Sequence, residues 1–457
     1  MRKEREKSLP EILGEYARRN PARFHMPGHK GRGIPMYESL SAWDVTELPD
    51  TDDLHAPAGP IRKTQSAYAT AYGARDCFLL VNGSTAGVQA MLLSLGQNKR
   101  VLMARDCHRS AISGLALAGH TADFVYPEPG GMITPQAVDD ALSQRPADAV
   151  FLTSPNYCGR CADVLGVAQA AHRHGAIVCL DAAHGAHFPF SDALPALYPK
   201  DVDMFCVSAH KTLNAFTQTA LLFTGQHCPL DAQHIQSALS MLQSSSPSYP
   251  LMLSLDWALH TATGWDAHAA RMRVFQKRVS AANGVTVQTE KCVGERGIFA
   301  LDPTRLVIDV HQRGVTGYAA YRSLYAKGVV AEAADMDHVI FITVPNDPQD
   351  WYDRLYEAVC TLPYGGRRAP SAPKPYTPAA PAVSIRDAML GDAVCVPLAK
   401  AAGHIAACAA GPYPPGVSLF FPGERIRQEY VDDLLACLSA GGAVFGLKQK
   451  ESICVLR

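Results

Sequence analysis

Five short apolar runs recur between residues 77 and 207, and most are followed first by a polar segment and then by a helical pattern. They cover residues 77–81, 101–104, 149–153, 176–180 and 204–207. Alternation of short strands with helices predicts an α/β fold, with a mainly parallel sheet covered by helices on both faces. Ligands of such a sheet bind beyond the carboxyl ends of its strands. The pattern therefore predicts both the fold class and the place of a site.

A glycine-containing turn, Asn82–Gly87, follows the first run and opens a helix that we expect to extend through Leu95. The backbone N–H groups and the positive dipole end of a helix N-terminus suit a phosphate. Ser84 or Thr85 can equally cap the helix, which is the commoner use of such residues, and the two roles are compatible. The turn lacks the lysine of a Walker loop and the glycine spacing of a dinucleotide fingerprint.

Lys211 follows the fifth run, within the segment Val207–Thr212. An amine held at a strand end can form a Schiff base with a carbonyl compound. Ser208 and His210 flank it as hydrogen-bond donors. The alternative is an ordinary solvated loop lysine, which is what most lysines are. The functional interpretation gains weight because other polar residues follow the neighbouring runs.

Three of those residues, Thr85, His108 and Asp181, stand at predicted strand ends. If the ligand is a phosphorylated pyridine aldehyde, a carboxylate at the pyridine nitrogen keeps the ring protonated and electron-withdrawing, and Asp181 is the candidate. His108 can stack on the ring. The alternatives are that Asp181 caps a helix and that His108 is a hydrogen-bonded core histidine.

Several longer motifs follow one another along the chain. They are FHMPGHK at 24–30, NGST at 82–85, DAAHGAH at 181–187, SAHKTL at 208–213, SSSPSY at 244–249, GPYPPG at 411–416 and PGE at 422–424. This set resembles the ornithine/lysine/arginine decarboxylase family over nearly the whole chain. The resemblance implies the aspartate aminotransferase-like fold, type I among pyridoxal 5'-phosphate (PLP) enzymes. The chain departs from the family at 48–53 and 156–159, and it is similar to the shorter members, which lack a receiver-like N-terminal domain.

The resemblance implies a role for each motif residue. Lys211 matches the Schiff-base lysine, Asp181 the partner of the pyridine nitrogen and His108 the stacking histidine. Further phosphate and cofactor contacts match Ser84, Thr85, Ser208 and His210. His184, close to Asp181 in sequence, is well placed to bond the phenolic oxygen of the cofactor.

Two further segments carry implications for partners. The stretch with Ser245 and Ser246 matches a family segment that reaches into the site of a second subunit, which implies a homodimer with shared active sites. Glu424 matches an acidic residue near the distal cation of the substrate. One acidic group recognises any such cation, so the sequence does not choose among arginine, lysine and ornithine.

The resemblance implies decarboxylation of a basic amino acid, in which the substrate amine displaces Lys211 and a general acid later protonates the carbanion. His210 is a candidate for that acid. The alternatives are an aminotransferase or lyase of the same fold, which usually clamps the substrate carboxylate with an arginine, and a non-catalytic PLP-binding regulator.

Domain organisation follows from composition shifts along the 457 residues. We expect an N-terminal helix and active-site loops at 1–60, a PLP-binding major domain at 61–280 and a small α/β domain at 281–362. A proline-rich linker at 363–383 then leads to a C-terminal domain at 384–457.

A net charge of −1 gives no broad field to attract nucleic acid or a membrane, and no apolar run is long enough to span one. We therefore expect a cytoplasmic enzyme with a small-molecule partner. The 13 cysteines are scattered and predicted to be reduced. Cys158 and Cys161 fit a redox or zinc spacing, but no second pair accompanies them, so we expect no metal. The acidic segment 46–55 lacks the spacing of a calcium loop.

Overall fold

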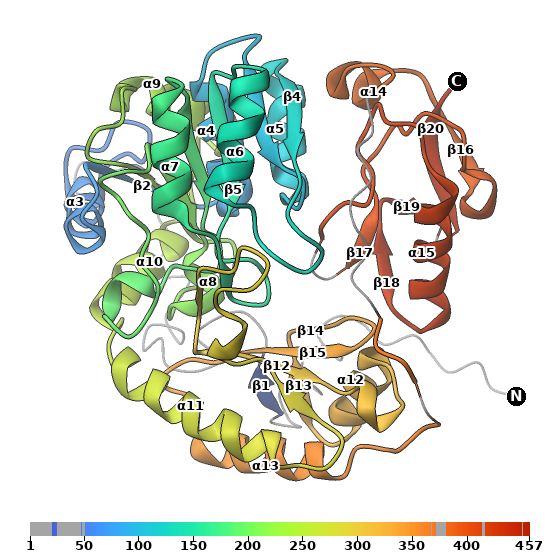
Figure 1. Cartoon of the computed structure of the whole chain (residues 1–457). Coiled ribbons are helices and arrows are strands. Elements are labelled where there is room, and N and C mark those ends of the chain that lie inside the picture. The colour runs from blue at the N-terminus through green and yellow to red at the C-terminus, as the bar shows by residue number, and fades with distance from the viewer. Residues whose placement is uncertain are drawn as a thin grey trace, which may run out of the picture.

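The computed structural model describes residues 21–24, 47, 51–366, 368–371, 381–413, 416–449 and 451–457. The expected N-terminal helix, the motif residues from His25 to Lys30, most of the proline-rich segment and Pro414–Pro415 lie outside these residues. Figure 1 shows a central sheet between two layers of helices, a smaller sheet unit below it and a C-terminal unit beside both.

The central sheet has seven strands, and all five predicted strands belong to it. The order is β2 (Asp76–Leu80), β9 (Ala220–Thr224), β8 (Met204–Val207), β7 (Ile177–Asp181), β5 (Ala149–Thr153), β3 (Arg100–Ala104) and β4 (Thr121–Val125). The pairs from β8 to β4 are parallel, and β9 is antiparallel to both of its neighbours. The expected α/β fold with a mainly parallel sheet is confirmed.

The antiparallel strand β9 has a local cause. Parallel neighbours require a long crossover, usually through a helix that packs on the sheet. Between β8 and β9 the chain forms only the four-residue helix α8 (Ala209–Thr212) and then turns back. Lys211 therefore lies in a short connection at the carboxyl end of β8, rather than in a long helical crossover.

Alternate residues of the central strands pack into two separate cores. In β7, Val178 and Leu180 join one core while Cys179 joins the other. In β8, Phe205 faces the first and Cys206 the second. A strand buried on both faces reads as a continuous apolar run, which is why these runs are visible in the sequence.

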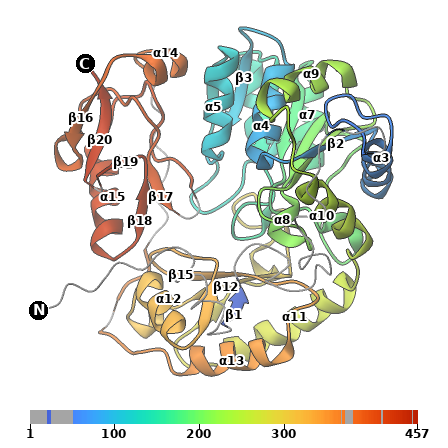
Figure 2. The ribbon, with the colours of Figure 1, turned by 180° about the vertical axis from the view of Figure 1, so that it is seen from behind.

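Helices cover both faces of this sheet (Figures 1 and 2). One layer comprises α4 (Gly83–Ser94), α5 (Arg109–Ala118) and α9 (Ala232–Leu242). The other comprises α3 (Pro60–Tyr72), α6 (Pro135–Gln144), α7 (Val164–Arg173) and α10 (Tyr249–His260). The helix expected after the glycine turn is thus α4.

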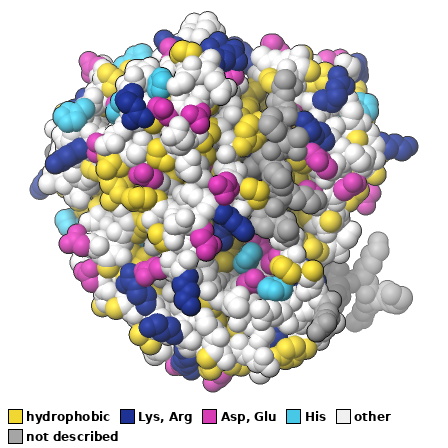
Figure 3. All heavy atoms as spheres, viewed as in Figure 1, with side chains coloured by type: hydrophobic (Ala, Val, Ile, Leu, Met, Phe, Trp, Pro, Cys, Tyr) yellow, Lys and Arg dark blue, Asp and Glu magenta, His cyan; other side chains and the backbone are white. Residues whose placement is uncertain are grey.

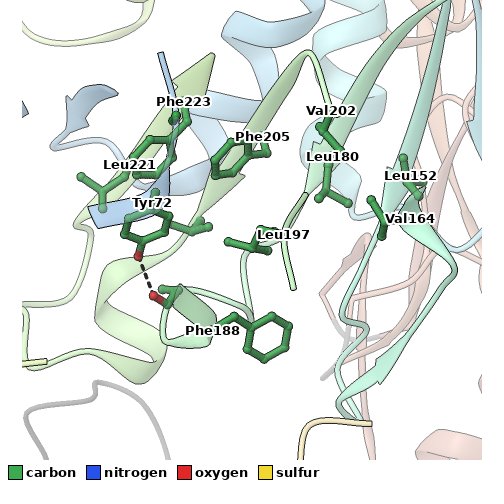
Figure 4. Packing of buried hydrophobic residues seen from close by; sticks show 14 of the residues in the cluster. Tyr72, Leu152, Val164, Leu180, Phe188, Leu197, Val202, Phe205, Leu221 and Phe223 are labelled. Atoms are coloured by element: carbon green, nitrogen blue, oxygen red, sulfur yellow. Dashed lines mark hydrogen bonds between the residues drawn. The ribbon is translucent and has the colours of Figure 1, made fainter. Parts of the chain in front are cut away.

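Tyr72, at the end of α3, fixes the loop that follows β7. Its ring stacks on Phe223 with 4.3 Å between centroids, and its hydroxyl donates to the Ala186 carbonyl at 2.5 Å. Figure 4 shows this bond beneath the aromatic cluster. Because Ala186 lies two residues beyond His184, this buried contact holds the histidine-rich loop against the core.

The start of α3 is held by Asp52. Its carboxylate accepts hydrogen bonds from the backbone N–H groups of Ala58, Gly59 and Ile61 at 2.8–3.0 Å. Free N–H groups at a helix N-terminus favour such a negatively charged acceptor. The described part of the acidic segment therefore caps a helix, in agreement with the absence of calcium-loop spacing.

The smaller unit is built on an antiparallel sheet. Its order is β10 (Thr286–Val287), β12 (Arg305–Asp309), β15 (His338–Ile342) and β14 (Ala333–Ala334). Around it lie α11 (Trp265–Ser280), α12 (Gly317–Ala326) and α13 (Gln349–Cys360). β1 (Ala22–Phe24) pairs in parallel with β13 (Val329–Ala331), and Phe24 packs against Phe341 at 5.6 Å. The N-terminal strand thus pairs with residues some 300 positions later in the sequence.

The C-terminal unit has its own core. A three-stranded sheet runs β16 (Ala393–Pro397), β20 (Ser452–Leu456) and β19 (Leu447–Lys448), and a second pairs β17 (Gly411–Tyr413) with β18 (Ala443–Phe445). Its helices are α14 (Ile385–Leu390) and α15 (Gln428–Ser439). Outside the three units' sheets, β6 (Arg160–Cys161) pairs with β11 (Ala300–Leu301), and 3-10 turns occur at Phe188–Phe190, Glu290–Cys292, His311–Arg313 and Leu398–Lys400.

Surface charge is mixed. On the face in Figure 3, lysine and arginine side chains alternate with acidic ones, as expected from the near-neutral sequence. Among the described residues no helix is both long and apolar enough to cross a membrane.

Candidate active site

A cavity of about 570 Å³ lies at the carboxyl edge of the central sheet. The segments that follow β2, β3, β5, β7 and β8 all contribute to its lining, as the strand-end argument predicted. From these segments come Ser84, Thr85, Asp106, His108, Asn156, Tyr157, Asp181, His184, Ser208, His210 and Lys211. The structure therefore brings together all the predicted site residues except Ser245, Ser246 and Glu424.

One end of the cavity is lined by hydroxyl groups at the start of α4. The buried Ser208 hydroxyl bonds that of Ser84 at 2.8 Å, and Thr85 is exposed beside it. Helix α4 reaches this position because it packs very closely on β8: a Cβ at Gly87 would lie 2.4 Å from the Cys206 sulfur. Hydroxyls at a helix N-terminus form an anion site, and the cap of α4 is Asn82 rather than Ser84 or Thr85.

Lys211 occupies the middle of the cavity. Its Nζ lies 2.9 Å from His184 Nε2. Burial lowers the pKa of Lys211 below its ordinary value, although the nearby carboxylates of Asp181 and Glu332 act in the opposite direction. Burial likewise raises the pKa of Asp181, against the effect of Lys211. A lysine with a lowered pKa is more often an uncharged nucleophile.

The proton position on His184 follows from its two neighbours. Arg305 Nη2 lies 3.4 Å from His184 Nδ1, and a guanidinium can only donate. Nδ1 must therefore accept, which leaves the proton of the neutral ring on Nε2, facing Lys211. Burial, followed by the positive charges of Lys211 and Arg305, keeps the pKa of His184 well below its ordinary value. With this tautomer, His184 can donate to the Lys211 amine when that amine is in its uncharged form.

His108 lies where the C-terminal unit meets the cavity. It caps α5, since its side chain accepts from the Ser110 N–H at 3.3 Å. Its backbone forms an antiparallel bridge with Val417, which lines the cavity together with Tyr413. Burial, with the charge of Lys211, lowers the pKa of His108 to about 4. The ring is therefore neutral near pH 7, as suits stacking on an aromatic ligand.

His210 presents a proton acceptor to the cavity. Its Nδ1 lies 2.8 Å from the Thr219 carbonyl, which can only accept, so Nδ1 carries the proton. Burial lowers the pKa of His210 to about 4. Its Nε2 is therefore unprotonated near neutral pH, and the ring must first gain a proton before it can act as the predicted general acid.

Sequence reasoning missed several acidic residues of the cavity. Glu332 and Asp335 come from the smaller unit and Asp106 from the loop after β3. The Tyr157 hydroxyl donates to Glu332 Oε1 at 2.5 Å. Burial raises the pKa of Asp106 to about 6. Asp106 stands beside His108 and could have been found at the same strand end, but nothing in the sequence around Glu332 marks it.

Glu424 does not face the cavity. Both of its carboxylate oxygens accept from the Arg105 guanidinium at 2.9 Å, and the two side chains are 2% and 1% exposed. This buried pair leaves Glu424 no access to a substrate cation in the same chain. The predicted substrate role of Glu424 is therefore corrected to an inter-domain ion pair.

Ser245 and Ser246 also lie outside the cavity of their own chain. They are exposed on the loop between α9 and α10. The loop is braced by His55, whose Nε2 lies 2.8 Å from the Ser244 carbonyl. An exposed, braced loop is compatible with the prediction that these serines contact a second subunit.

The cysteine pair at 158 and 161 gains no support as a redox or metal site. Burial raises the pKa of Cys158 to about 11 and that of Cys161 above its ordinary value. Thiols with raised pKa values are poor nucleophiles and poor metal ligands. Within the described ranges no group of three or more histidine, cysteine, aspartate or glutamate residues is placed to hold a metal ion.

Comparisons with known proteins agree with this geometry. Residues 8–350 match the family described as Orn/Lys/Arg decarboxylase, major domain, and residues 369–447 match the corresponding C-terminal domain. The arginine decarboxylase of Bacillus subtilis is 29% identical over an alignment of 461 positions, which covers 95% of this chain and 94% of the relative. That of Bacillus cereus is 31% identical over an alignment of 448 positions, which covers 92% of this chain and 96% of the relative. Lysine decarboxylase A from Pseudomonas aeruginosa is a similar solved structure, with 16% identity and a TM-score of 0.75 over 99% of this chain and 83% of that one.

Proposed function

Because the chain belongs to the Orn/Lys/Arg decarboxylase family, we propose that it removes the carboxyl group of a basic amino acid and releases the corresponding amine and CO2. Its fold is the aspartate aminotransferase-like fold of type I PLP enzymes. The relatives named arginine decarboxylase extend over almost the full chain, which makes arginine the first substrate to test, before lysine and ornithine. We further propose a cytoplasmic role in polyamine synthesis.

The cavity residues fit PLP as the cofactor. The hydroxyls of Ser84, Thr85 and Ser208 at the start of α4 supply an anion site for its phosphate. Asp181 supplies a buried carboxylate for the pyridine nitrogen, and Lys211 supplies an amine with a lowered pKa for the aldehyde. When bound, PLP acts as an electron sink that allows the bond between the α-carbon and the carboxylate to break.

The residues of this chain position groups and protons around that chemistry. We propose that His184 donates from Nε2 to the uncharged form of the Lys211 amine and so directs its lone pair. His108 and Val417 close one side of the cavity with apolar and neutral groups. His210 lines the cavity and its Nε2 can accept a proton, and we propose that it delivers this proton to the product.

The substrate cation has acidic partners in the cavity itself. Glu332, Asp335 and Asp106 line it, whereas Glu424 is held by Arg105. Asp335 already accepts from the His338 N–H at 2.7 Å and contacts His338 Nδ1. We propose Glu332, whose negative charge also acts on Lys211, as the principal carboxylate for the distal ammonium or guanidinium group.

A homodimer with shared active sites completes the proposal. Ser245 and Ser246 lie on an exposed loop outside their own cavity, and we propose that they contact the cofactor of a second subunit. Sedimentation of the holoenzyme, compared with a Ser246→Trp variant, tests this contact because the larger side chain should weaken the dimer and lower cofactor retention.

The juxtaposition of Lys211, His184 and Asp181 at adjacent strand ends carries the functional proposal. The test is an amino-acid panel assayed for CO2 and for keto acid, with PLP present and with Lys211→Ala alongside. We expect CO2 from one basic amino acid, a visible absorbance band of the lysine-bound cofactor, and loss of both in the variant. Lys63→Ala, on the exposed face of α3, is the matched control.

Keto acid without CO2 would replace the decarboxylase by an aminotransferase. The absorbance band without either product would indicate a PLP-binding regulator. Absence of the band in the wild-type protein would refute the role of Lys211.

A further inference from the structure

Two cysteines of the C-terminal unit face each other across neighbouring strands. Cys395 in β16 is directly opposite Cys454 in β20, and their sulfur atoms are 3.5 Å apart. Cys395 is exposed and Cys454 is partly so. Most of the other cysteines of the chain are buried, so this pair differs from them in both proximity and access.

The backbone register places the pair where cross-strand side chains are closest. The Cys454 carbonyl accepts from the Ala407 N–H at 3.1 Å, on the side of β20 that faces away from β16. The N–H and C=O of one strand residue point the same way, so Cys395 and Cys454 form a non-hydrogen-bonded pair. The α-carbons of such pairs are about 4.5 Å apart, within the range of roughly 4.4–6.8 Å that a disulfide spans.

Neighbouring residues fix both thiols on the outer face of the sheet. Val455 and Ile453, which flank Cys454, are buried in the core of the unit, so the alternation along β20 directs Cys454 outward. β16 is an edge strand of the sheet, which leaves Cys395 open to solvent. Burial and the adjacent Cys395 thiol raise the pKa of the Cys454 thiol, and the charge of Lys448, on the adjoining strand β19, offsets this only in part. The pair is therefore distinguished by its proximity and its access to solvent, not by a lowered pKa.

We propose that Cys395 and Cys454 are a redox-sensitive pair that closes to an intrachain disulfide on exposure to a peroxide. One thiol loses its proton, and the thiolate attacks an oxygen of hydrogen peroxide. The O–O bond breaks, a sulfenic acid forms, and the hydroxide that leaves takes up the proton lost by the thiol and becomes water. The second thiol then displaces the hydroxyl group of the sulfenic acid as a second water, and the sulfur–sulfur bond forms. The two thiols lose two electrons in total, and the peroxide gains them.

The bond would cross-link the two ends of the C-terminal unit. The segment between Cys395 and Cys454 contains Tyr413, Val417 and Glu424, which contact the cavity or its supporting loop. Cross-linking restricts the unfolded chain and so stabilises the unit that carries them. This inference does not depend on the catalysed reaction, because the thiols lie outside the cavity lining.

The test is graded oxidation of the full-length protein with hydrogen peroxide, followed by peptide mapping under non-reducing conditions. We expect loss of two thiols per chain at low oxidant, a linked peptide that contains positions 395 and 454, and a higher melting temperature that a reductant reverses. Cys395→Ser should lose the linked peptide and the temperature shift, and Cys454 should then become sulfenic or sulfinic acid. Cys360→Ser, which removes another exposed thiol, is the matched control and should retain both.

Two results would overturn the proposal. One is first oxidation at another pair, such as Cys158 with Cys161 or Cys408 with Cys454. The other is full oxidation of Cys360 while the thiols at 395 and 454 stay reduced. Each readout is independent of decarboxylation, so an inactive protein with a normal 395–454 bond would count against the proposed function alone.

Discussion

Arg105 and Glu424 form a bidentate ion pair between positions that are 319 residues apart in the chain. Both side chains are almost fully buried, and the guanidinium carbon of Arg105 lies 3.8 Å from the centroid of the Phe421 ring. The pair joins the C-terminal unit to the end of β3, immediately before Asp106 and His108. An ion pair just outside the cavity lining therefore fixes the position of one wall of the cavity.

Removal of one partner of this pair should be costly. Glu424→Gln leaves the buried Arg105 charge uncompensated, and such changes cost about 3–5 kcal/mol of the free energy of unfolding. Urea unfolding measures the loss. Glu429→Gln, in an exposed pair with Arg427, is the control and should cost less than about 1 kcal/mol. A variant with a raised KM and an unchanged free energy of unfolding would instead indicate that Glu424 binds the substrate directly.

Asp181→Asn should separate cofactor binding from catalysis. The amide keeps the size of the side chain and can still accept from the Ala183 N–H, but it cannot hold a positive pyridine nitrogen in place. We expect kcat to fall on the order of 10²–10³-fold, while the absorbance of bound PLP persists. Asp181→Glu keeps the charge and tests its position. An Asn variant with normal kcat would remove Asp181 from the proposed mechanism.

His210 should make stability depend on pH in a defined direction. Its pKa is about 4 in the folded protein against an ordinary value of 6.5. Between these values the unfolded chain binds the proton and the folded chain does not, so the free energy of unfolding falls as the pH falls. One such group contributes up to about 1.4 kcal/mol per pH unit.

This contribution is measured as the difference between wild type and His210→Gln, with urea unfolding across that pH window. Other groups titrate in the same range, and they cancel in the difference. His260→Gln alters an exposed histidine and should leave the slope unchanged. If His210→Gln also left it unchanged, His210 would not be the depressed group.

Glu332→Gln tests the acid proposed to bind the substrate cation. The glutamine can still accept from the Tyr157 hydroxyl, so folding should be little affected. Loss of a charged hydrogen bond is worth about 1.5–3 kcal/mol, so KM for the basic substrate should rise roughly 10-fold or more. Glu290→Gln removes an exposed carboxylate paired with Arg273 and serves as the control. Equal KM values for the two variants would exclude Glu332.

The central sheet and the cofactor side of the site were predictable because both depend on short-range sequence. A strand buried on two faces must be apolar throughout, and the polar residue that follows it must lie at the sheet edge. This reasoning located His108, Asp181 and Lys211, and the longer motifs assigned them roles. The same logic applies to Asp106, which the sequence analysis passed over.

The substrate side was less accessible to sequence reasoning. Glu332 lines the cavity only because the smaller unit packs next to the carboxyl edge of the central sheet. Glu424 forms an ion pair with Arg105, which is distant from it in the sequence. The motif that contains Glu424 identified a segment close to the site, but it gave no indication that Glu424 pairs with Arg105. Such long-range pairings leave no local periodicity, so a single sequence contains no signal for them.

The bridge between His108 and Val417 has a consequence for biosynthesis. The nascent chain carries Ser84, Asp181 and Lys211 well before Val417 is made, an interval of tens of seconds at about 5–20 residues per second. During that time the large domain can fold with its reactive amine uncovered on one side. Once the C-terminal unit has been synthesised and has folded, it covers this side of the cavity. A chain whose synthesis stops before Val417 therefore keeps the Lys211 amine exposed on that side.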